Sequence, residues 1–233
     1  MIELIRGQFE NIDIPRHIDM ILMDPPDNVG LEYDSYDDNL PDGEYQYLLE
    51  RWLRKAVSLT SGPVWITFNE KWIGTIENIL SSCNIRLIQR CWWHWTFGQA
   101  CKTRYTPSIR PIYWLNNNTI FSSQIRIPSA RQTKYNDKRA KSGGKLPDNV
   151  WEFSRVCGTF NERRRWHVCQ IPEGLMERVI LGHTLPGATI LDPFIGSGTT
   201  AIVANRLARN CIGIDQSQVY LDKIRTEIDK NGR

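Results

Sequence analysis

The chain has 233 residues, a mass of 27.1 kDa and a formal net charge of only +3. This length suits one large α/β domain with a small insertion, and the net charge alone is too small to indicate a nucleic-acid partner. Residues 1–20 lack the pattern of a secretory signal, and no stretch approaches the roughly 18 uninterrupted apolar residues of a membrane-spanning helix. We therefore expect a soluble intracellular protein with no membrane partner.

The cysteines exclude two common kinds of structural site. They are scattered without a Cys-x-x-Cys pair, so neither a zinc site nor a disulfide framework is indicated. We expect reduced thiols and no metal at these six positions: Cys83, Cys91, Cys101, Cys157, Cys169 and Cys211.

The first part of the chain predicts a parallel sheet. Residues 2–5 and 18–23 are short, Ile-rich and followed by turn-forming residues, as buried parallel strands are. Residues 44–59 repeat apolar side chains at the spacing of an amphipathic helix, and residues 63–68 follow as another buried strand. The succession of strand, helix and strand predicts parallel pairing.

The middle of the chain predicts a different arrangement. Residues 85–97 and 109–115 are expected to be two further strands that form an antiparallel edge of the sheet. Residues 116–150 are polar and basic and show no sustained helical or strand period, so they are the best candidate for an insertion.

The last part of the chain again predicts helices and strands in alternation. A helix is predicted over 173–185, a strand over 188–191, a helix over 199–208 and a strand over 211–214, followed by a final amphipathic helix.

A glycine turn joins two of these predicted elements. Asp192 ends a strand, Gly196 and Gly198 lie in the turn, and a helix follows directly. Glycines let a ligand approach the backbone, and the N–H groups of a helix start favour a carboxylate or phosphate. Asp215, at the end of the next strand, is placed to accept hydrogen bonds from two ribose hydroxyls. No third glycine follows at the dinucleotide spacing, which favours another adenosine-containing ligand over NAD.

A second turn carries Asp24, Pro25 and Pro26 at the end of a hydrophobic strand. The prolines restrict the backbone, so the Asp24 carboxylate and the Pro25 carbonyl have a preset direction. Two acceptors suit methylation of an exocyclic amine, because they can bind both N–H groups and stabilise the developing positive charge. The absence of a Pro-Cys turn argues against methylation at carbon 5 of cytosine.

The nine residues 192–200, DPFIGSGTT, resemble the S-adenosylmethionine motif of the DNA amino-methyltransferases, which methylate adenine N6 or cytosine N4. The resemblance implies that Asp192 faces the methionine ammonium group and that Asp215 holds the ribose. It also implies that the methionine end of the cofactor is lined by Pro193, Phe194, Gly196, Ser197, Gly198, Thr199 and Thr200.

The order of the two turns resembles the β group of this family. Asp24 precedes Asp192 by 192 − 24 = 168 residues, whereas the cofactor turn ordinarily comes first. The segment before the cofactor turn is similar to the family's His-Pro-x-Gln-Lys-Pro-Glu, with matches at His167, Gln170, Pro172 and Glu173. His167 and Gln170 are therefore expected to support the cofactor pocket, whereas Val168 and Ile171 depart from the pattern. Gln8 stands where relatives carry an acidic residue near the cofactor adenine.

The resemblance implies a Rossmann-like, doubly wound, mostly parallel α/β sheet with a small inserted target-recognition region. We expect a single methyltransferase domain over 1–233. Its parts are a catalytic half at 1–115, the basic insertion at 116–150 and a cofactor-binding half at 151–233.

One position departs from the family's catalytic motif. Relatives follow Pro-Pro with an aromatic residue that stacks on the extruded base, and this chain has Asp27 there. Because extrusion costs a few kcal/mol, another aromatic side chain is needed. The candidates are Tyr33, Tyr36, Trp93, Trp95 and Phe97. We include Asp24, Pro25, Pro26 and Asp27 in the predicted catalytic turn.

Basic residues gather in the insertion, interleaved with Ser, Thr and Asn. Over residues 126–145 the only acidic residue is Asp137, so this stretch is strongly basic. Such a stretch suits contact with the phosphates of double-stranded DNA. They are Arg126, Arg131, Lys134, Lys138, Arg139, Lys141 and Lys145. A second run, Arg163, Arg164 and Arg165, predicts a clamp beside the cofactor pocket. So small an insertion predicts a short recognition site or a homodimer.

The sequence thus predicts a cytoplasmic bacterial or phage enzyme that flips a base and methylates adenine N6 in DNA with S-adenosylmethionine. Asp24 favours adenine, because cytosine-N4 relatives more often begin this motif with Ser. Cytosine N4, an RNA substrate, a catalytically silent binding module and an NAD-type oxidoreductase remain open alternatives. Restriction-modification, orphan and phage roles leave no distinguishing mark in the sequence.

Overall fold

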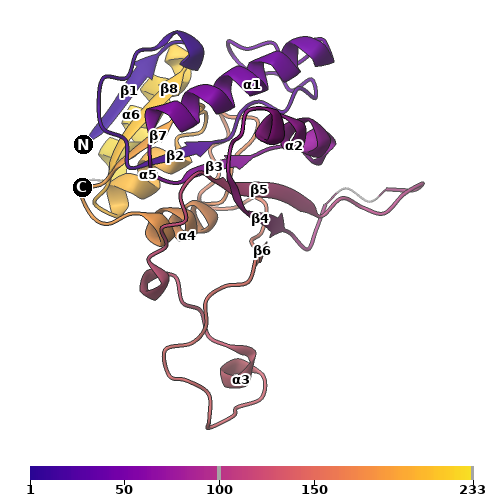
Figure 1. Cartoon of the computed structure of the whole chain (residues 1–233), viewed down its shortest axis with the longest axis vertical. Coiled ribbons are helices and arrows are strands. Elements are labelled where there is room, and N and C mark those ends of the chain that lie inside the picture. Colours follow the sequence, from indigo (N-terminus) through magenta and orange to yellow (C-terminus); the bar gives the residue numbers. More distant parts are fainter. Residues whose placement is uncertain (99–100, 232–233) are drawn as a thin grey trace.

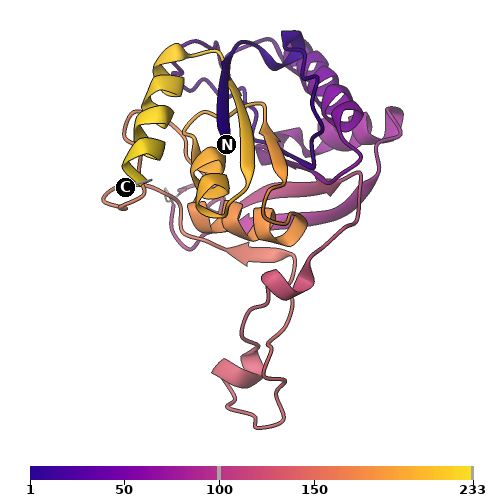
Figure 2. The same ribbon diagram turned by 90° about the vertical axis from the view of Figure 1, so that its left-hand side faces the viewer.

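The computed structural model describes residues 1–98 and 101–231, which form one eight-stranded sheet with helices on both faces (Figures 1 and 2). The strands lie in the order β1-β8-β7-β2-β3-β5-β4-β6, and β5 alone runs against the others. Their bounds are β1 Ile2–Arg6, β2 Met20–Met23, β3 Val64–Thr67, β4 Leu87–His94, β5 Ile109–Leu115, β6 Val150–Glu152, β7 Thr189–Asp192 and β8 Asn210–Asp215.

Two layers of helices enclose the sheet. The first contains α1 (Asp42–Leu59) and α2 (Ile73–Ser82), and the second contains α4 (Glu173–His183), α5 (Thr199–Arg206) and α6 (Gln218–Asn231). The short elements are α3 (Ala130–Thr133) and three 3-10 turns, η1 (Phe9–Asn11), η2 (Glu70–Trp72) and η3 (Ser122–Gln124). Within the described residues, no helix combines the length and apolarity that a membrane crossing needs.

Alternation along the strands divides the interior into two cores. Ile21 and Met23 of β2 pack with α1 and α2, whereas Met20 and Leu22 pack with α4 and α5. All four residues of β2 are buried. A strand that is buried on both faces has a continuous run of apolar residues in its sequence. For this reason residues 18–23 could be predicted to be a parallel strand.

The doubly wound, mostly parallel sheet is confirmed, with two corrections. The two strands predicted to form an antiparallel edge do pair antiparallel, as β4 and β5, but they are not the outermost pair. The outer strand is β6, which pairs with β4 over Trp92 to His94 and spans the predicted boundary between the insertion and the cofactor half. Helix α2 was not predicted, although Ile73, Ile76 and Leu80 have helical spacing.

The parallel strands point their carboxyl ends to one edge of the sheet, where β2 and β7 end at Met23 and Asp192. Strand β5 ends at the opposite edge, since Leu115 pairs with Val64, the first residue of β3. The segment that follows β5 extends away from the sheet as an arm, with α3 near its far end (Figure 1). Residues 116–149 therefore leave the sheet on the side away from Asp24.

Candidate active site

The two predicted turns meet at the carboxyl edge of the sheet. Strands β2 and β7 are neighbours in parallel register, with Ile21 opposite Leu191. Asp24 follows β2 directly and Asp192 ends β7, so residues 168 positions apart line one cavity. Its empty volume is about 1210 Å³, part of it open to solvent.

The glycine turn is held in a conformation that excludes larger residues. Gly196 and Gly198 have φ values of +42° and +79°. A Cβ on Gly196 would lie 2.8 Å from His167 Nε2, and a Cβ on Gly198 would lie 2.6 Å from Ile224. Gly196 lines the cavity, so its small size keeps the cavity wall beside His167. Gly198 is the N-cap of α5 and lies behind the cavity, where its small size allows contact with Ile224 of α6.

Two carboxylates of this half, one buried and one half-buried, have no cationic partner among the described residues. Asp192 is 5% exposed and accepts a hydrogen bond from the backbone N–H of Phe194. Burial raises the pKa of Asp192 to about 7, and no ion pair to it occurs within residues 1–98 and 101–231. Asp215 accepts hydrogen bonds from the backbone of Gly196 and Ser217, and burial raises its pKa too. Such a site favours a ligand that brings a positive charge.

Most of the remaining predicted cofactor residues line the cavity. Phe194 lines the cavity and packs edge-on against Trp52, with ring centroids 4.8 Å apart. Gln8 also lines it and donates to the side chain of Gln216. The cavity wall further includes Pro193, Ser197, Thr199, Thr200 and His167.

Gln170 does not line this cavity. Its side-chain oxygen accepts from the backbone of Arg164, and its side-chain nitrogen donates to the carbonyl of Glu162. Its place is behind the wall, where it holds the loop that precedes α4.

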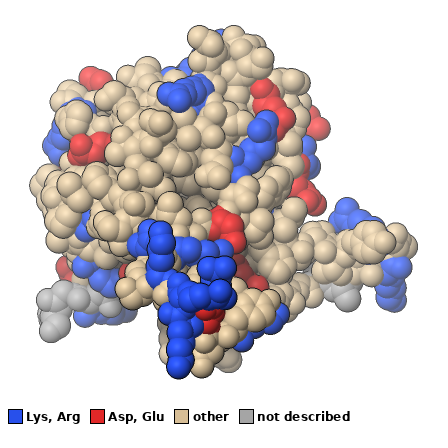
Figure 3. All heavy atoms as spheres, turned by 60° about the horizontal axis from the view of Figure 1, so that its bottom comes forward, with Lys and Arg blue, Asp and Glu red and all other residues tan. Residues whose placement is uncertain are grey.

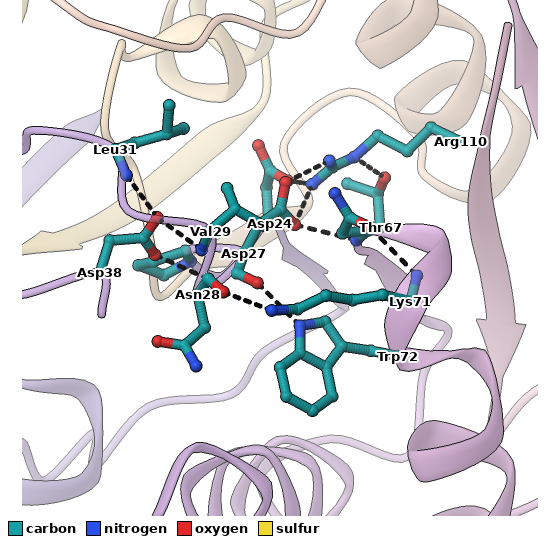
Figure 4. A network of polar contacts seen from close by, with 12 residues as sticks. Asp24, Asp27, Asn28, Val29, Leu31, Asp38, Thr67, Lys71, Trp72 and Arg110 are labelled. Atoms are coloured by element: carbon teal, nitrogen blue, oxygen red, sulfur yellow. Dashed lines mark hydrogen bonds and ion pairs between the residues drawn. The ribbon is translucent and has the colours of Figure 1, made fainter. Parts of the chain in front are cut away.

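The Asp-Pro-Pro turn forms part of a charged network (Figure 4). Arg110 of β5 donates from Nη2 to Asp24 Oδ1 at 2.9 Å and from Nη1 to Asp27 Oδ2 at 2.6 Å. Its Nε donates to Thr67 Oγ1. The Asp24 side chain is 29% exposed, and no hydrogen bond reaches its Oδ2 among the described residues. Burial raises the pKa of Asp24 to about 6, and Arg110 opposes that shift.

Asp27 does not replace the missing aromatic residue. It is 7% exposed, and its carboxylate also accepts from the backbone N–H of Asn69. Among the candidates for stacking, Tyr33 and Tyr36 line the cavity. Trp93, Trp95 and Phe97 lie outside its wall, and Trp93 is buried with its indole N–H bonded to the carbonyl of Phe153.

The loop after the turn is fixed by Asp38, which sequence reasoning missed. Asp38 accepts from the backbone N–H groups of Asn28, Val29 and Leu31, and Figure 4 shows these contacts beside Asp27. Asp34 farther along the same loop accepts from Ser217 Oγ at the start of α6. The loop thus closes one side of the cavity and carries Tyr33 into it.

One of the three arginines in the second basic run, Arg164, is buried and does not belong to a surface clamp. Arg164 is only 7% exposed, and its Nη2 donates to Glu173 Oε1 at 2.7 Å. Its Nη1 donates to Thr199 Oγ1. The prediction that Arg164 binds nucleic acid is therefore corrected, because its guanidinium is enclosed behind the glycine turn. Arg163 and Arg165 are exposed.

The basic residues of the insertion are exposed and gather on the projecting arm (Figure 3). Some of them already have partners. Arg126 donates to the carbonyls of Gly143 and Gly144, which joins the two legs of the arm. Arg139 forms an ion pair with Asp137 at 3.0 Å. Exposed side chains without an ion pair to another described residue include Lys134, Lys138 and Lys141.

The residues of the cavity fit S-adenosylmethionine. Asp192 is a buried carboxylate that lacks a cation, Gly196 lines the cavity, and Asp215 adds a second carboxylate to its wall. The wall of Phe194, Ile195 and Ile214 supplies apolar contact for the rest. Within the described residues, no group of three or more His, Cys, Asp and Glu is placed to hold a metal ion.

Comparison with known proteins agrees with this geometry. Residues 18–226 match the family model described as DNA methylase. The chain is 35% identical over 222 residues to the type II methyltransferase M.HpaI of Haemophilus parainfluenzae, covering 91% of this chain and 68% of the relative. It is 29% identical to the DNA adenine methyltransferase YhdJ of Escherichia coli, covering 88% and 74%.

Solved structures share the fold. The complex of M1.HpyAVI with S-adenosylmethionine aligns with a TM-score of 0.61 at 20% identity, over 98% of this chain and 100% of that chain. The cytosine-N4-specific PvuII DNA methyltransferase aligns with a TM-score of 0.70 at 15% identity, over 100% and 93%. The chain therefore belongs to the DNA methylase family, as its motifs predicted, and is an S-adenosylmethionine-dependent DNA methyltransferase.

Proposed function

We propose that this enzyme methylates the N6 amine of adenine in double-stranded DNA. The observation that carries the proposal is the position of Asp24, which presents an unbonded carboxylate oxygen to the cavity that the glycine turn lines. A carboxylate there can accept one N–H of an extruded base while the methyl donor lies on the glycine side.

Asp24 and the Pro25 carbonyl are the proposed acceptors for the two N–H groups of the target amine. The amine lone pair is delocalised into the ring, and binding both hydrogens favours a pyramidal nitrogen that attacks more readily. The negative charge of Asp24 also stabilises the positive charge that develops on the nitrogen. Bound S-adenosylmethionine supplies an electrophilic methyl group on a sulfonium centre.

The cofactor half has a separate proposed role. Asp192 pairs with the methionine ammonium group, which removes the cost of burying an unpaired carboxylate. Asp215 accepts from the ribose hydroxyls, and Gln8 lies at the adenine end. His167 packs over Gly196 and sets the depth of the turn.

Tyr33 is the proposed stacking partner for the extruded base. It lines the same cavity as Asp24. Aromatic stacking offsets part of the few kcal/mol that extrusion costs.

Adenine is favoured over cytosine by the Asp that opens the motif. Both substrates occur among similar proteins, since YhdJ is named a DNA adenine methyltransferase and the PvuII enzyme is cytosine-N4-specific. The curated relatives are mostly type II methyltransferases, which supports a restriction-modification role in the cytoplasm of a bacterium. A homodimer is a further prediction, which sedimentation would test.

The insertion is the proposed DNA-recognition region of this single domain. Its exposed Lys and Arg side chains suit phosphate contacts, which fix the position of a protein on DNA without specifying sequence. We keep the division into a catalytic half at 1–115 and a cofactor half at 151–233, with β6 at their junction.

The proposal is tested by expressing the protein in a host without adenine methylation and sequencing its DNA with detection of modified bases. N6-methyladenine at one short motif is expected with the wild type and its absence with Asp24→Ala. Asp229→Asn, which changes an exposed carboxylate on α6, is the matched control and should leave methylation intact. N4-methylcytosine would replace the adenine assignment, and unmodified DNA with the wild type would overturn the proposed activity.

A further inference from the structure

The departure at position 27 places a second carboxylate beside Asp24. The Asp27 side chain is 10% exposed and belongs to the same turn. Its Oδ1 accepts from Asn69 N at 2.9 Å, and its backbone carbonyl accepts from the indole N–H of Trp72 at 2.7 Å. Asp27 is therefore held in place by Asn69 and by Trp72 of η2, independently of Arg110.

Arg110 divides its donors unequally between the two carboxylates. Asp27 receives two hydrogen bonds, from Nη1 at 2.6 Å and from Nη2 at 3.0 Å, whereas Asp24 receives one at 2.9 Å. Thr67 accepts from Nε and fixes the plane of the guanidinium. Paired N–H groups on one carboxylate form the stronger and more directional contact, so Asp27 is the principal partner of Arg110.

The charges of this network do not cancel. Two carboxylates and one guanidinium leave a net charge of −1 when both acids are ionised. If Arg110 paired with Asp24 alone, the charge of Asp24 would be neutralised and both of its oxygens would face the arginine. With Asp27 present, one oxygen of Asp24 is oriented and the other stays open to the cavity.

We propose that Asp27 is a positioning residue for Asp24, acting through Arg110. By taking the larger share of the guanidinium, Asp27 lets Arg110 aim Asp24 while one oxygen and one net negative charge remain for the target amine. This inference rests on the proposed function, since it concerns the carboxylate that accepts the amine N–H. It also gives position 27 a role that differs from the stacking role of the family's aromatic residue.

Other titratable groups face Asp24 from the surrounding elements. Cys169, from the segment before α4, has a pKa raised by burial to about 11, so its thiol is neutral near pH 7. Burial also raises the pKa of Tyr33 on the loop after the turn, and that phenol is neutral as well. Asp192 on β7 is an acidic neighbour whose charge is offset when a cation binds beside it. Arg110 and Asp27 are thus the charges that control Asp24 in the cofactor complex.

The pH dependence of methyl transfer distinguishes this arrangement from a structural one. Asp24 must be ionised to accept an N–H, so its titration sets the acid limb of the rate profile. The charge of Asp27 raises the pKa of Asp24 and the charge of Arg110 lowers it. Removing one charge or the other should therefore move the acid limb in opposite directions.

The test is single-turnover methyl transfer with saturating cofactor and DNA between pH 5 and 9, using the full chain. Asp27→Asn is expected to move the acid limb to lower pH and to reduce the plateau rate at least about tenfold, because Arg110 then closes on Asp24. Arg110→Gln is expected to move the acid limb to higher pH. Asp27→Glu, which keeps the charge, should keep the limb near that of the wild type.

Controls separate this result from misfolding and from failure of the proposed function. Arg90→Gln removes an ion pair of similar length, to Glu77 at 2.7 Å, and should leave the profile unchanged. Cofactor affinity, measured by equilibrium dialysis, should stay within about threefold of the wild type in all variants. Acid limbs that move the same way, or not at all, would overturn the inference while leaving the proposed function intact. A wild-type enzyme without methyl transfer would overturn both.

Discussion

Arg164 and Glu173 form a buried ion pair behind the glycine turn, with Nη2 of the arginine 2.7 Å from Oε1 of the glutamate. The same guanidinium donates to Thr199 Oγ1 in the first turn of α5. The segment before α4 is thereby tied to the helix that starts at the cofactor turn, so this arginine supports the cofactor wall from inside the protein.

Arg164→Ala should lower the free energy of unfolding by about 2 kcal/mol, because it leaves part of Glu173 without its partner. The loss is below the usual ~3–5 kcal/mol for a broken buried pair, since Arg206 still pairs with Glu173. Urea denaturation measures the change. Arg163→Ala, at an exposed neighbour, is the control. A variant as stable as the wild type but with a flatter salt dependence of DNA binding would restore Arg164 as a DNA contact.

Gly196→Ala should weaken S-adenosylmethionine binding about tenfold or more. A methyl group at this position meets His167 Nε2 at 2.8 Å, and the φ of +42° is unfavourable for alanine. Equilibrium dialysis measures the affinity, and Gly187→Ala, at a loop glycine whose added Cβ meets no atom within 4 Å, controls for backbone strain. Equal affinities for Gly196→Ala and the wild type would contradict the fitted turn.

Asp192→Asn should stabilise the cofactor-free protein at pH 8 and abolish cofactor binding. The folded-state pKa of about 7 lies above the ordinary 3.8, so folding takes up a proton between these values and stability falls as pH rises through them. The amide avoids this penalty, worth on the order of 4 kcal/mol, but cannot pair with an ammonium group. Thermal melting at pH 5 and pH 8 measures the effect. A stability gain equal at both pH values would contradict it.

Replacing Lys138, Arg139 and Lys141 with Ala should weaken DNA binding and reduce the slope of log affinity against log salt by about 2, since each phosphate contact contributes roughly 0.9. Three substitutions are expected to remove fewer than three contacts, because Arg139 is paired with Asp137. Fluorescence anisotropy from 50 to 200 mM salt measures the slope. Arg225 and Lys230 of α6, replaced together, form the control, and an unchanged slope in the triple variant would exclude the arm from DNA contact.

Tyr33→Leu should reduce the rate of methyl transfer much more than the affinity for S-adenosylmethionine, because the extruded base loses its stacking surface. A 2-aminopurine at the target position reports extrusion by its fluorescence, which should fall in Tyr33→Leu and persist in Tyr33→Phe. Fluorescence that stays at the wild-type level in Tyr33→Leu would direct attention to Tyr36, which also lines the cavity.

The two motifs could be predicted because each is local in sequence. Asp24 and Asp192 end buried strands, and the rule that parallel strands bring their carboxyl ends to one edge was sufficient to place them together. Arg110 could not be predicted in this way, since it is 83 residues from Asp27 and reaches it across β3 and β5. Only pairing of those strands brings it to the site.

Burial explains the remaining errors. A run of three arginines carries no sign of which one is enclosed, and Arg164 is buried because Glu173 and Thr199 pair with it. Gln170 matches the family motif, yet its amide binds loop backbone rather than the cavity. β6 has three residues, too few to show a period, and depends on its register with β4.

The arm leaves the sheet far from the active site, so changes in the arm are separated in space from changes in the catalytic residues. Residues 116–149 begin after Leu115, at the edge opposite Asp24, and return to the sheet at β6. Substitutions or insertions in the arm therefore lie apart from the residues at the carboxyl edge of the sheet, where Asp24 and Asp192 line the cavity. If the arm binds DNA as proposed, changes confined to it can alter how the enzyme holds DNA while the geometry of the cavity is retained.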